Sequence, residues 1–187
     1  MEIPQSVLVW KFAGKQGGLT AINNYKNNEG YNMYCMTNQK YLSWRKNRIG
    51  VNLDYISDDA ERKIHFHRPD EKEAPLLTGE KVAFGLGGDP SFLNYTEQRL
   101  GINLGFKKSA SYEWIIFGES GKKSEVVETG KLYALVNINV KPNPDFLIYL
   151  DREIPRTCDI GWTTSPNKLG KILNVAQAIN NLRKEIL

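Results

Sequence analysis

The chain has few cysteines and few histidines. Of its 187 residues only Cys35 and Cys158 are cysteines, and only two are histidines. Two cysteines provide no framework of paired thiols, which excludes the small secreted disulfide scaffold and the cysteine-rich zinc module. A folded chain of this length buries about 70% of the surface that its unfolded state exposes, so a hydrophobic core can form without disulfides or metal ions.

A long hydrophobic run is also missing. No stretch approaches the ~18 consecutive apolar residues of a membrane-spanning helix. The first 18 residues carry neither the basic leader nor the apolar run of a signal peptide. We therefore expect a soluble, cytoplasmic protein, and release by a non-classical route stays open.

Charge of one sign is not in large excess. The sequence has 25 basic and 21 acidic residues, a formal net charge of +4, and the two signs are interspersed. A nucleic-acid-binding protein normally concentrates basic residues on one surface, together with aromatic residues that stack on bases. The composition therefore predicts no nucleic-acid partner.

What the sequence does contain is an internal repeat. Residues 41–55 match residues 92–106 without a gap, so that Leu93 lies 51 residues after Leu42. A third copy begins at Phe146, after a slightly longer turn. The resulting units cover about 6–58, 59–109 and 110–164.

Each unit contains four short segments that are typical of β-strands. They are about five to seven residues long, rich in aromatic and branched residues, and alternate in polarity. The second segment of each unit opens at a glycine, Gly30, Gly79 or Gly130, where a positive φ or a close backbone approach fits. Three units of four segments predict an all-β fold of twelve strands.

Twelve antiparallel strands in three similar units resemble the β-trefoil superfamily, which includes ricin-B-type lectins, fascin-like actin bundlers, Kunitz-type inhibitors and interleukin-1-like cytokines. The resemblance covers about residues 6–164. It implies a closed six-stranded barrel capped by three hairpins. Ricin-B-type lectins carry a Gln-x-Trp signature near the end of each repeat. No binding residue is carried over from them, because the corresponding places here read Asn52-Leu53-Asp54, Asn103-Leu104-Gly105 and Gly161-Trp162-Thr163.

We expect a trefoil domain of residues 1–164. The sequence of residues 165–187 predicts an amphipathic α-helix that follows it. Ser165-Pro166 is typical of a helix start, and apolar residues then recur at three- and four-residue spacing. The pattern favours a helix packed on the barrel. Docking to a partner or to a second copy in a homodimer, and contact with a membrane surface, are open alternatives.

No set of residues predicts a catalytic site. His65 and His67 share one face of a predicted strand, a spacing compatible with a metal site, but two ligands without a third are usually unoccupied. Phe66 takes the inward position between them, so we expect the histidines to face solvent or a loop. The glycine-rich residues 85–89 precede Pro90 and a strand, so no helix N-terminus follows to meet a phosphate. We predict a protein that is not an enzyme and that uses no metal and no cofactor.

A binding function fits the repeat better. Equivalent loops of a threefold scaffold present one small site up to three times, and weak sites then gain from multivalency. Sugar recognition combines an aromatic plane with planar polar groups, and the loop after each second strand offers both. Turn formation by the polar residues and core packing by the aromatic ones is the alternative interpretation. The candidate ligand-binding residues are Asn38, Gln39, Asp89, Tyr95, Asn143, Asp145 and Tyr149.

We therefore expect a lectin-like module that binds a carbohydrate or glycoconjugate. One alternative is a protein-binding trefoil of the cytoskeletal or inhibitor type. Another is a toxin-associated or pore-forming protein in which the trefoil delivers the C-terminal helix to a membrane.

Overall fold

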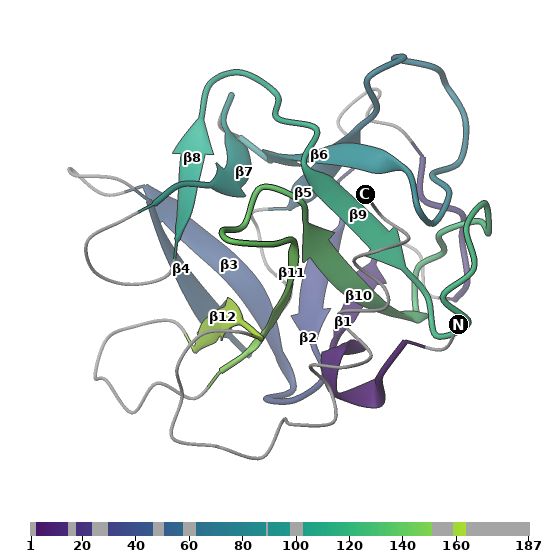
Figure 1. Ribbon diagram of the computed structural model, residues 1–187, viewed down its shortest axis with the longest axis horizontal. Helices are drawn as coiled ribbons and strands as arrows, with labels where there is room; N and C mark the ends of the chain where they lie inside the picture. The colour runs from purple at the N-terminus through teal and green to yellow at the C-terminus, as the bar shows by residue number, and fades with distance from the viewer. Residues whose placement is uncertain are drawn as a thin grey trace.

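The computed structural model describes residues 3–14, 18–23, 30–46, 51–57, 63–88, 90–97, 103–150 and 159–163 (Figure 1). Within these residues the chain forms twelve β-strands and one short 3-10 helix, so the predicted all-β class and strand number are confirmed. The helix expected over 165–187 lies outside the described residues. Among the described residues, a search for apolar helices of membrane-spanning length finds none.

The strands are three to seven residues long. The 3-10 helix η1 spans Gln5–Val7. The strands are β1 (Trp10–Ala13), β2 (Asn32–Cys35), β3 (Lys40–Lys46), β4 (Val51–Ile56), β5 (Ile64–His67), β6 (Lys81–Leu86), β7 (Phe92–Tyr95), β8 (Leu104–Lys107), β9 (Trp114–Phe117), β10 (Leu132–Asn137), β11 (Asp145–Tyr149) and β12 (Ile160–Trp162).

Each run of four consecutive strands forms an antiparallel meander. β1 to β4 pair in chain order, as do β5 to β8 and β9 to β12. Cys35, Leu86 and Asn137 each lie opposite the first residue of the first strand of their own meander. These three positions are 51 residues apart, which is the spacing of the sequence repeat.

The three meanders join into a closed ring of six strands. β10 pairs with β1, and β6 pairs with β9. The third junction is a bridge between Tyr31, just before β2, and Ile64 of β5, with reciprocal N–H to O hydrogen bonds of 2.8 and 2.9 Å. The ring therefore runs β1, β2, β5, β6, β9, β10 and back to β1, and a closed ring leaves few unpaired strand edges.

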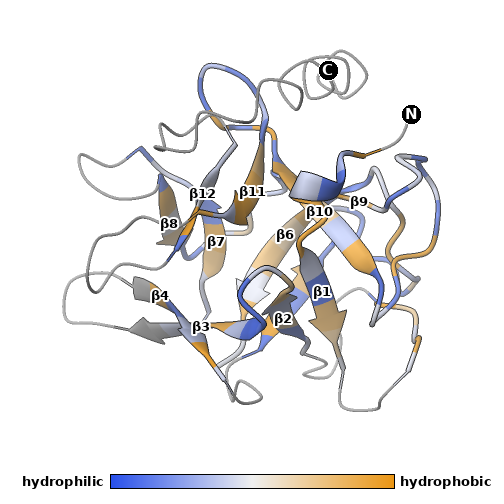
Figure 2. Ribbon diagram, turned by 90° about the horizontal axis from the view of Figure 1, so that it is seen from below, coloured by the Kyte–Doolittle hydropathy of each residue, from blue (hydrophilic) through white to orange (hydrophobic). Residues whose placement is uncertain are grey.

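The remaining strands and the connecting segments occupy different ends of the ring. β4, β8 and β12, the last strands of the meanders, lie on the same side of the molecule in Figures 1 and 2. The described parts of the segments that follow β1, β5 and β9 lie on the opposite side. These connecting segments also pair with one another, through the bridges Ala21 with Glu128, Asn23 with Pro75, and Leu77 with Val126.

Three aliphatic residues close the end that these connecting segments form. Ile22, Leu76 and Val127 are each 0% exposed. Ile22 N donates to Val127 O (2.8 Å), Val127 N donates to Leu76 O (2.8 Å), and Leu76 N donates to Ile22 O (2.7 Å). We call these three residues the closure triangle. Each residue donates its backbone N–H to one of the others and accepts a bond at its carbonyl oxygen from the third. If one of these three bonds breaks, a buried N–H and a buried C=O lose their partners.

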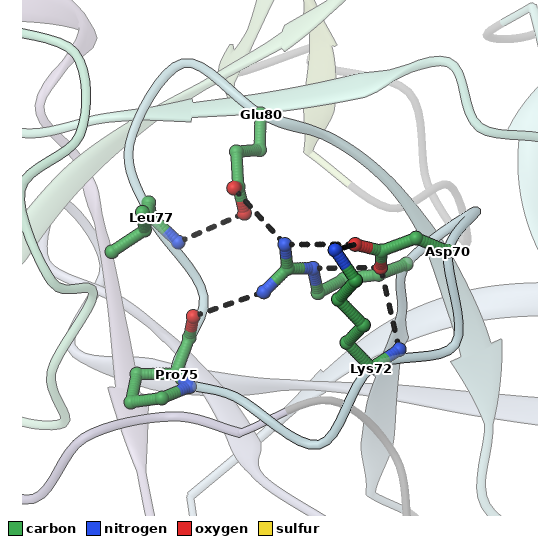
Figure 3. A network of polar contacts seen from close by, with 6 residues as sticks. Asp70, Lys72, Pro75, Leu77 and Glu80 are labelled. Atoms are coloured by element: carbon green, nitrogen blue, oxygen red, sulfur yellow. Dashed lines mark hydrogen bonds and ion pairs between the residues drawn. The ribbon is translucent and has the colours of Figure 1, made fainter.

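A guanidinium fixes the segment that carries Leu76. Arg68, which follows β5, forms ion pairs with Asp70 and Glu80, each at 3.2 Å (Figure 3). It also donates to the carbonyl oxygen of Pro75 at 3.4 Å. Pro75 precedes Leu76 and Glu80 follows it, so the planar, rigid guanidinium holds the chain on both sides of Leu76.

Aromatic rings fill the interior of the ring of strands. Phe12, Phe66, Phe84 and Trp114 are fully buried and in successive contact, with ring centroids 5.0, 5.1 and 4.9 Å apart. Edge-to-face and stacked arrangements at these distances add to the free energy gained by burial alone. Figure 2 shows hydrophobic residues on strands of all three meanders, among them β1, β6, β7 and β11.

Two tryptophans tie consecutive meanders together through their indole N–H groups. Trp10, at the start of β1, donates to the carbonyl oxygen of Leu147 at 2.7 Å. Trp114, at the start of β9, donates to the carbonyl oxygen of Leu93 at 2.8 Å. Both bonds are buried and join a first strand to the third strand of the meander before it in the ring, so each tryptophan is a hydrophobic anchor with a satisfied polar atom.

The outer face of β9, β10 and β11 carries a second hydrophobic cluster. All four residues of β9 are buried, so the alternation expected of a strand with one solvated face fails here. Residues 3–8, including η1, pack on this face. The cluster consists of Ile3, Val7, Leu8, Ile115, Phe117, Ala134, Val136, Phe146 and Ile148.

One predicted equivalence is wrong by two positions. Gly79 and Gly130 have φ values of 81° and 80°, as the sequence predicts, but Gly30 does not have a positive φ. Tyr31 and Val82 occupy equivalent places in the ring, so Gly30 corresponds to the residue two places after Gly79. Gly30 serves a close approach instead, because an added Cβ would lie 2.6 Å from a side-chain carbon of the segment before β5.

Truncation in the closure triangle tests its importance for stability. We expect Leu76→Ala to lower the free energy of unfolding by about 3 kcal/mol, because it leaves a cavity among fully buried side chains. The control is Leu19→Ala, since Leu19 is 63% exposed and its truncation should change stability by about 0.5 kcal/mol or less. Urea denaturation measures both, and equal effects would contradict the role given to Leu76.

Candidate functional site

The predicted ligand residues of the first unit shape a turn. Asn38 Oδ1 accepts a hydrogen bond from Lys40 N at 3.2 Å, and Gln39 has a φ of 57°. Both residues lie between β2 and β3, where an asparagine side chain commonly stabilises a turn through such a bond. The equivalent candidate of the second unit, Asp89, lies outside the described residues.

The two polar candidates of the third unit differ in access to solvent. Asn143 is exposed in the turn before β11. Asp145 is 0% exposed, and its Oδ1 accepts hydrogen bonds from Phe146 N at 2.8 Å and from the Thr163 hydroxyl. The structure therefore places Asp145 in the link between β11 and the end of β12, closed to a ligand from solvent.

Tyr95 and Tyr149 lie at the end of the ring where the meanders terminate. Tyr95 is half-buried at the end of β7, and its ring centroid is 6.1 Å from that of Trp162 on β12. Its phenol oxygen accepts a hydrogen bond from Asn103 Nδ2 at 3.4 Å. An aromatic ring with one apolar side and one polar atom is thus held at the boundary between core and solvent.

Tyr149 has a similar environment on β11. Its ring centroid is 6.1 Å from that of Tyr55 on β4. The Tyr149 hydroxyl donates to Asp159 Oδ2 at 3.4 Å, and the Tyr55 hydroxyl donates to the carbonyl oxygen of Asp159 at 3.3 Å. Both tyrosines are half-buried against the main core.

Tyr55, Tyr95, Tyr149 and Trp162 form what we call the aromatic end. Strands of all three meanders contribute to it: β4, β7, β11 and β12. Sequence reasoning identified Tyr95 and Tyr149 but missed the partners Tyr55, Asn103 and Asp159. The recurrence of an aromatic residue at Tyr55 and, 51 residues on, Phe106 was an available signal for Tyr55. The contact between Tyr55 and Asp159 joins residues 104 positions apart, so no local sequence pattern indicates it.

A buried carboxylate lies next to the aromatic end. Glu113 is 1% exposed and accepts four hydrogen bonds. They come from Tyr95 N, Ser111 Oγ (2.5 Å), Asn137 Nδ2 (2.7 Å) and Asn139 Nδ2 (2.8 Å). A carboxylate with this many donors is compensated for the cost of burial. Glu113 therefore links β7, β10 and the start of β9, and it positions the backbone of Tyr95.

The two histidines of β5 are half-buried over two glycines, one in β6 and one just after it. Phe66 takes the inward position between them, as predicted, and is 0% exposed. An added Cβ would lie 3.1 Å from His65 Nε2 at Gly87 and 2.9 Å from His67 Nε2 at Gly85. The imidazoles thus cover the backbone of β6 rather than facing open solvent. In the described part of the chain, no group of three or more His, Cys, Asp or Glu side chains is placed to hold a metal ion.

The environment of His67 predicts a pH-dependent stability. Burial and, to a lesser extent, His65 lower the pKa of His67 below 6.5. Below about pH 6.5 the unfolded state therefore binds more protons than the folded state, until the lower folded pKa is passed. The contribution of neutral His67 to the free energy of unfolding is fully present above about pH 6.5. It is lost as the pH falls from there to the lower pKa of the folded state. We expect His67→Gln to reduce the loss of stability between about pH 7.5 and about pH 5.5, measured by urea denaturation. Identical pH profiles for the two proteins would contradict the effect.

The chain was also compared with known proteins. No protein-family model, no curated protein and no solved structure matches it.

Proposed function

We propose that the chain adopts a β-trefoil architecture. Three meanders at a 51-residue spacing, the closed ring of six strands, and the gathering of β4, β8 and β12 at one end support it. In such an architecture the loops and strand ends vary while the ring is kept, so binding sites are found at its ends.

We infer that the function is the binding of a carbohydrate or glycoconjugate at the aromatic end. The observation that carries this inference is the shared environment of Tyr95 and Tyr149. Each ring is half-buried, and each phenol oxygen lies within hydrogen-bond distance of a planar polar side chain, Asn103 or Asp159. A pyranose requires the same two components, an apolar surface for its C–H face and planar groups for its hydroxyls.

The hydrogen bonds at the aromatic end are long enough to be exchanged for bonds to a ligand. The contacts of Tyr95 and Tyr149 are both 3.4 Å, at the weak limit for such bonds. A sugar hydroxyl can insert between the two groups of either pair without leaving a polar atom unpaired, because it accepts from the donor and donates to the acceptor. Weak individual sites of this kind act through multivalency when several sugars are presented together.

A glycan array and two variants of Tyr149 test the proposed function. We expect the protein to bind a defined set of glycans. Tyr149→Phe keeps the ring but removes the bond to Asp159, whereas Tyr149→Ser removes both. We expect Tyr149→Ser to weaken binding at least tenfold, equivalent to about 1.4 kcal/mol, and Tyr149→Phe to weaken it less.

The matched control is Tyr41→Ser, because Tyr41 is half-buried and its ring centroid lies 5.0 Å from that of Tyr34. Its neighbour Leu42 lies opposite Tyr55, so the Tyr41 side chain points to the other face of the sheet. The melting temperature of Tyr41→Ser, measured with those of the Tyr149 variants, reports on loss of folding. An array without any bound glycan, or equal losses in Tyr41→Ser and Tyr149→Ser, would refute a sugar site at the aromatic end.

A further inference from the structure

An open groove lies at the other end of the ring, beside the closure triangle. It has a volume of about 830 Å³ and is formed mainly by the segment between β9 and β10. Val127 points into the core, and its neighbours Val126 and Glu128 line the groove. The groove is therefore built on a segment whose backbone is fixed by the closure hydrogen bonds.

The groove has an excess of negative charge. Glu119, Glu125 and Glu128 line it together with a single cation, Lys131. Lys131 Nζ forms an ion pair with Glu128, and this bond raises the pKa of the lysine. Among the described residues, no ion pair joins Glu119 or Glu125 to a cation. The lining of the groove is therefore negative although the chain as a whole has a formal charge of +4.

Neutral donors orient both of these carboxylates. Ser120 Oγ donates to Glu125 Oε2 at 2.7 Å, and Gln5 Nε2 of η1 donates to Glu119 Oε1 at 2.6 Å. Each bond restrains one carboxylate oxygen and leaves the negative charge uncompensated. Such restraint reduces the entropy cost of binding a cation.

The floor of the groove is apolar. Val126 is 42% exposed, and Leu132, which also lines the groove, is partly buried. Tyr133 is buried, and its hydroxyl accepts from Glu128 N (2.7 Å) and donates to Glu128 O (3.1 Å). An apolar floor below oriented carboxylates matches a side chain with an aliphatic stem and a cationic end, which arginine and lysine both have.

We propose that this groove binds an arginine or lysine side chain of a partner polypeptide. The stem lies on Val126 and Leu132, and the charged end lies between Glu119 and Glu125. An arginine fits best, because its planar guanidinium presents several donors to two carboxylates at once. Tyr133 is only 2% exposed and offers no ring face, so this groove differs from the aromatic end and does not depend on sugar binding there.

The wall of the groove provides a variant that fills it. Gly118 has no positive φ, and an added Cβ would lie 3.9 Å from Glu125 Oε2 and 3.9 Å from Tyr133 Cε1. Gly118→Phe therefore places a side chain in the groove without a clash at Cβ. Glu119→Gln combined with Glu125→Gln removes the charge instead and keeps the shape. Glu97→Gln is the control for loss of a carboxylate elsewhere on the surface, because Glu97 is exposed and does not line the groove.

Fluorescence anisotropy with a labelled hexapeptide that contains two arginines among alanines tests the proposal. We expect the wild-type protein to bind this peptide, and to bind the same peptide with citrulline in place of arginine at least tenfold more weakly. The double glutamine variant and Gly118→Phe should each weaken arginine-peptide binding at least tenfold. Glu97→Gln should change it less than twofold, and added salt should weaken it because exposed charges are screened.

Three results would overturn the proposal. They are equal affinity for the arginine and citrulline peptides, an equal loss of affinity in Glu97→Gln and in the double variant, and binding of spermine without binding of the peptide. Melting temperatures confirm that each variant is folded. Glycan binding by Gly118→Phe should be unchanged, which separates failure at the groove from failure of the proposed sugar site.

Discussion

The closure triangle is the constraint on which the rest of the structure depends. Ile22, Leu76 and Val127 come from three segments far apart in the sequence, yet their backbones bond in a cycle. Each segment connects two strands of the ring, so fixing the three segments relative to each other also fixes those strands. A buried backbone group without a partner is costly, so the three segments are expected to form this end of the ring together.

The two ends of the ring have different chemistry because the three meanders are not identical. At one end, Arg68 binds its own segment tightly, whereas the equivalent segment between β9 and β10 keeps the carboxylates of the groove. At the other end, the core positions Cys35 and Leu86 correspond to Asn137, which is bonded to the buried Glu113. Departures from the repeat thus coincide with the places where we propose binding.

The sequence predicted the features that depend on local pattern. The 51-residue repeat identified twelve strands, and alternation placed Phe66 in the core. Features that depend on distant contacts were not predictable in this way. Ile115 and Phe117 on the outer face of β9 need residues 3–8 to cover them, and a period-two pattern does not show that cover. The buried carboxylate of Asp145 is bonded to Thr163, and Tyr149 contacts Asp159 and Tyr55. Gly30 was wrongly equated with Gly79 and Gly130, because the sequence shows that a residue is glycine but does not show its backbone conformation.

Amide hydrogen exchange, measured by NMR, tests the central role of the closure triangle most directly. If the cycle is the common support of the three segments, the amide protons of Ile22, Leu76 and Val127 exchange only through global unfolding. All three then report the same opening free energy, which also equals the value from denaturation. Exchange of one or more of them at rates typical of exposed loops, while the amides of β6 and β10 remain protected, would contradict this account.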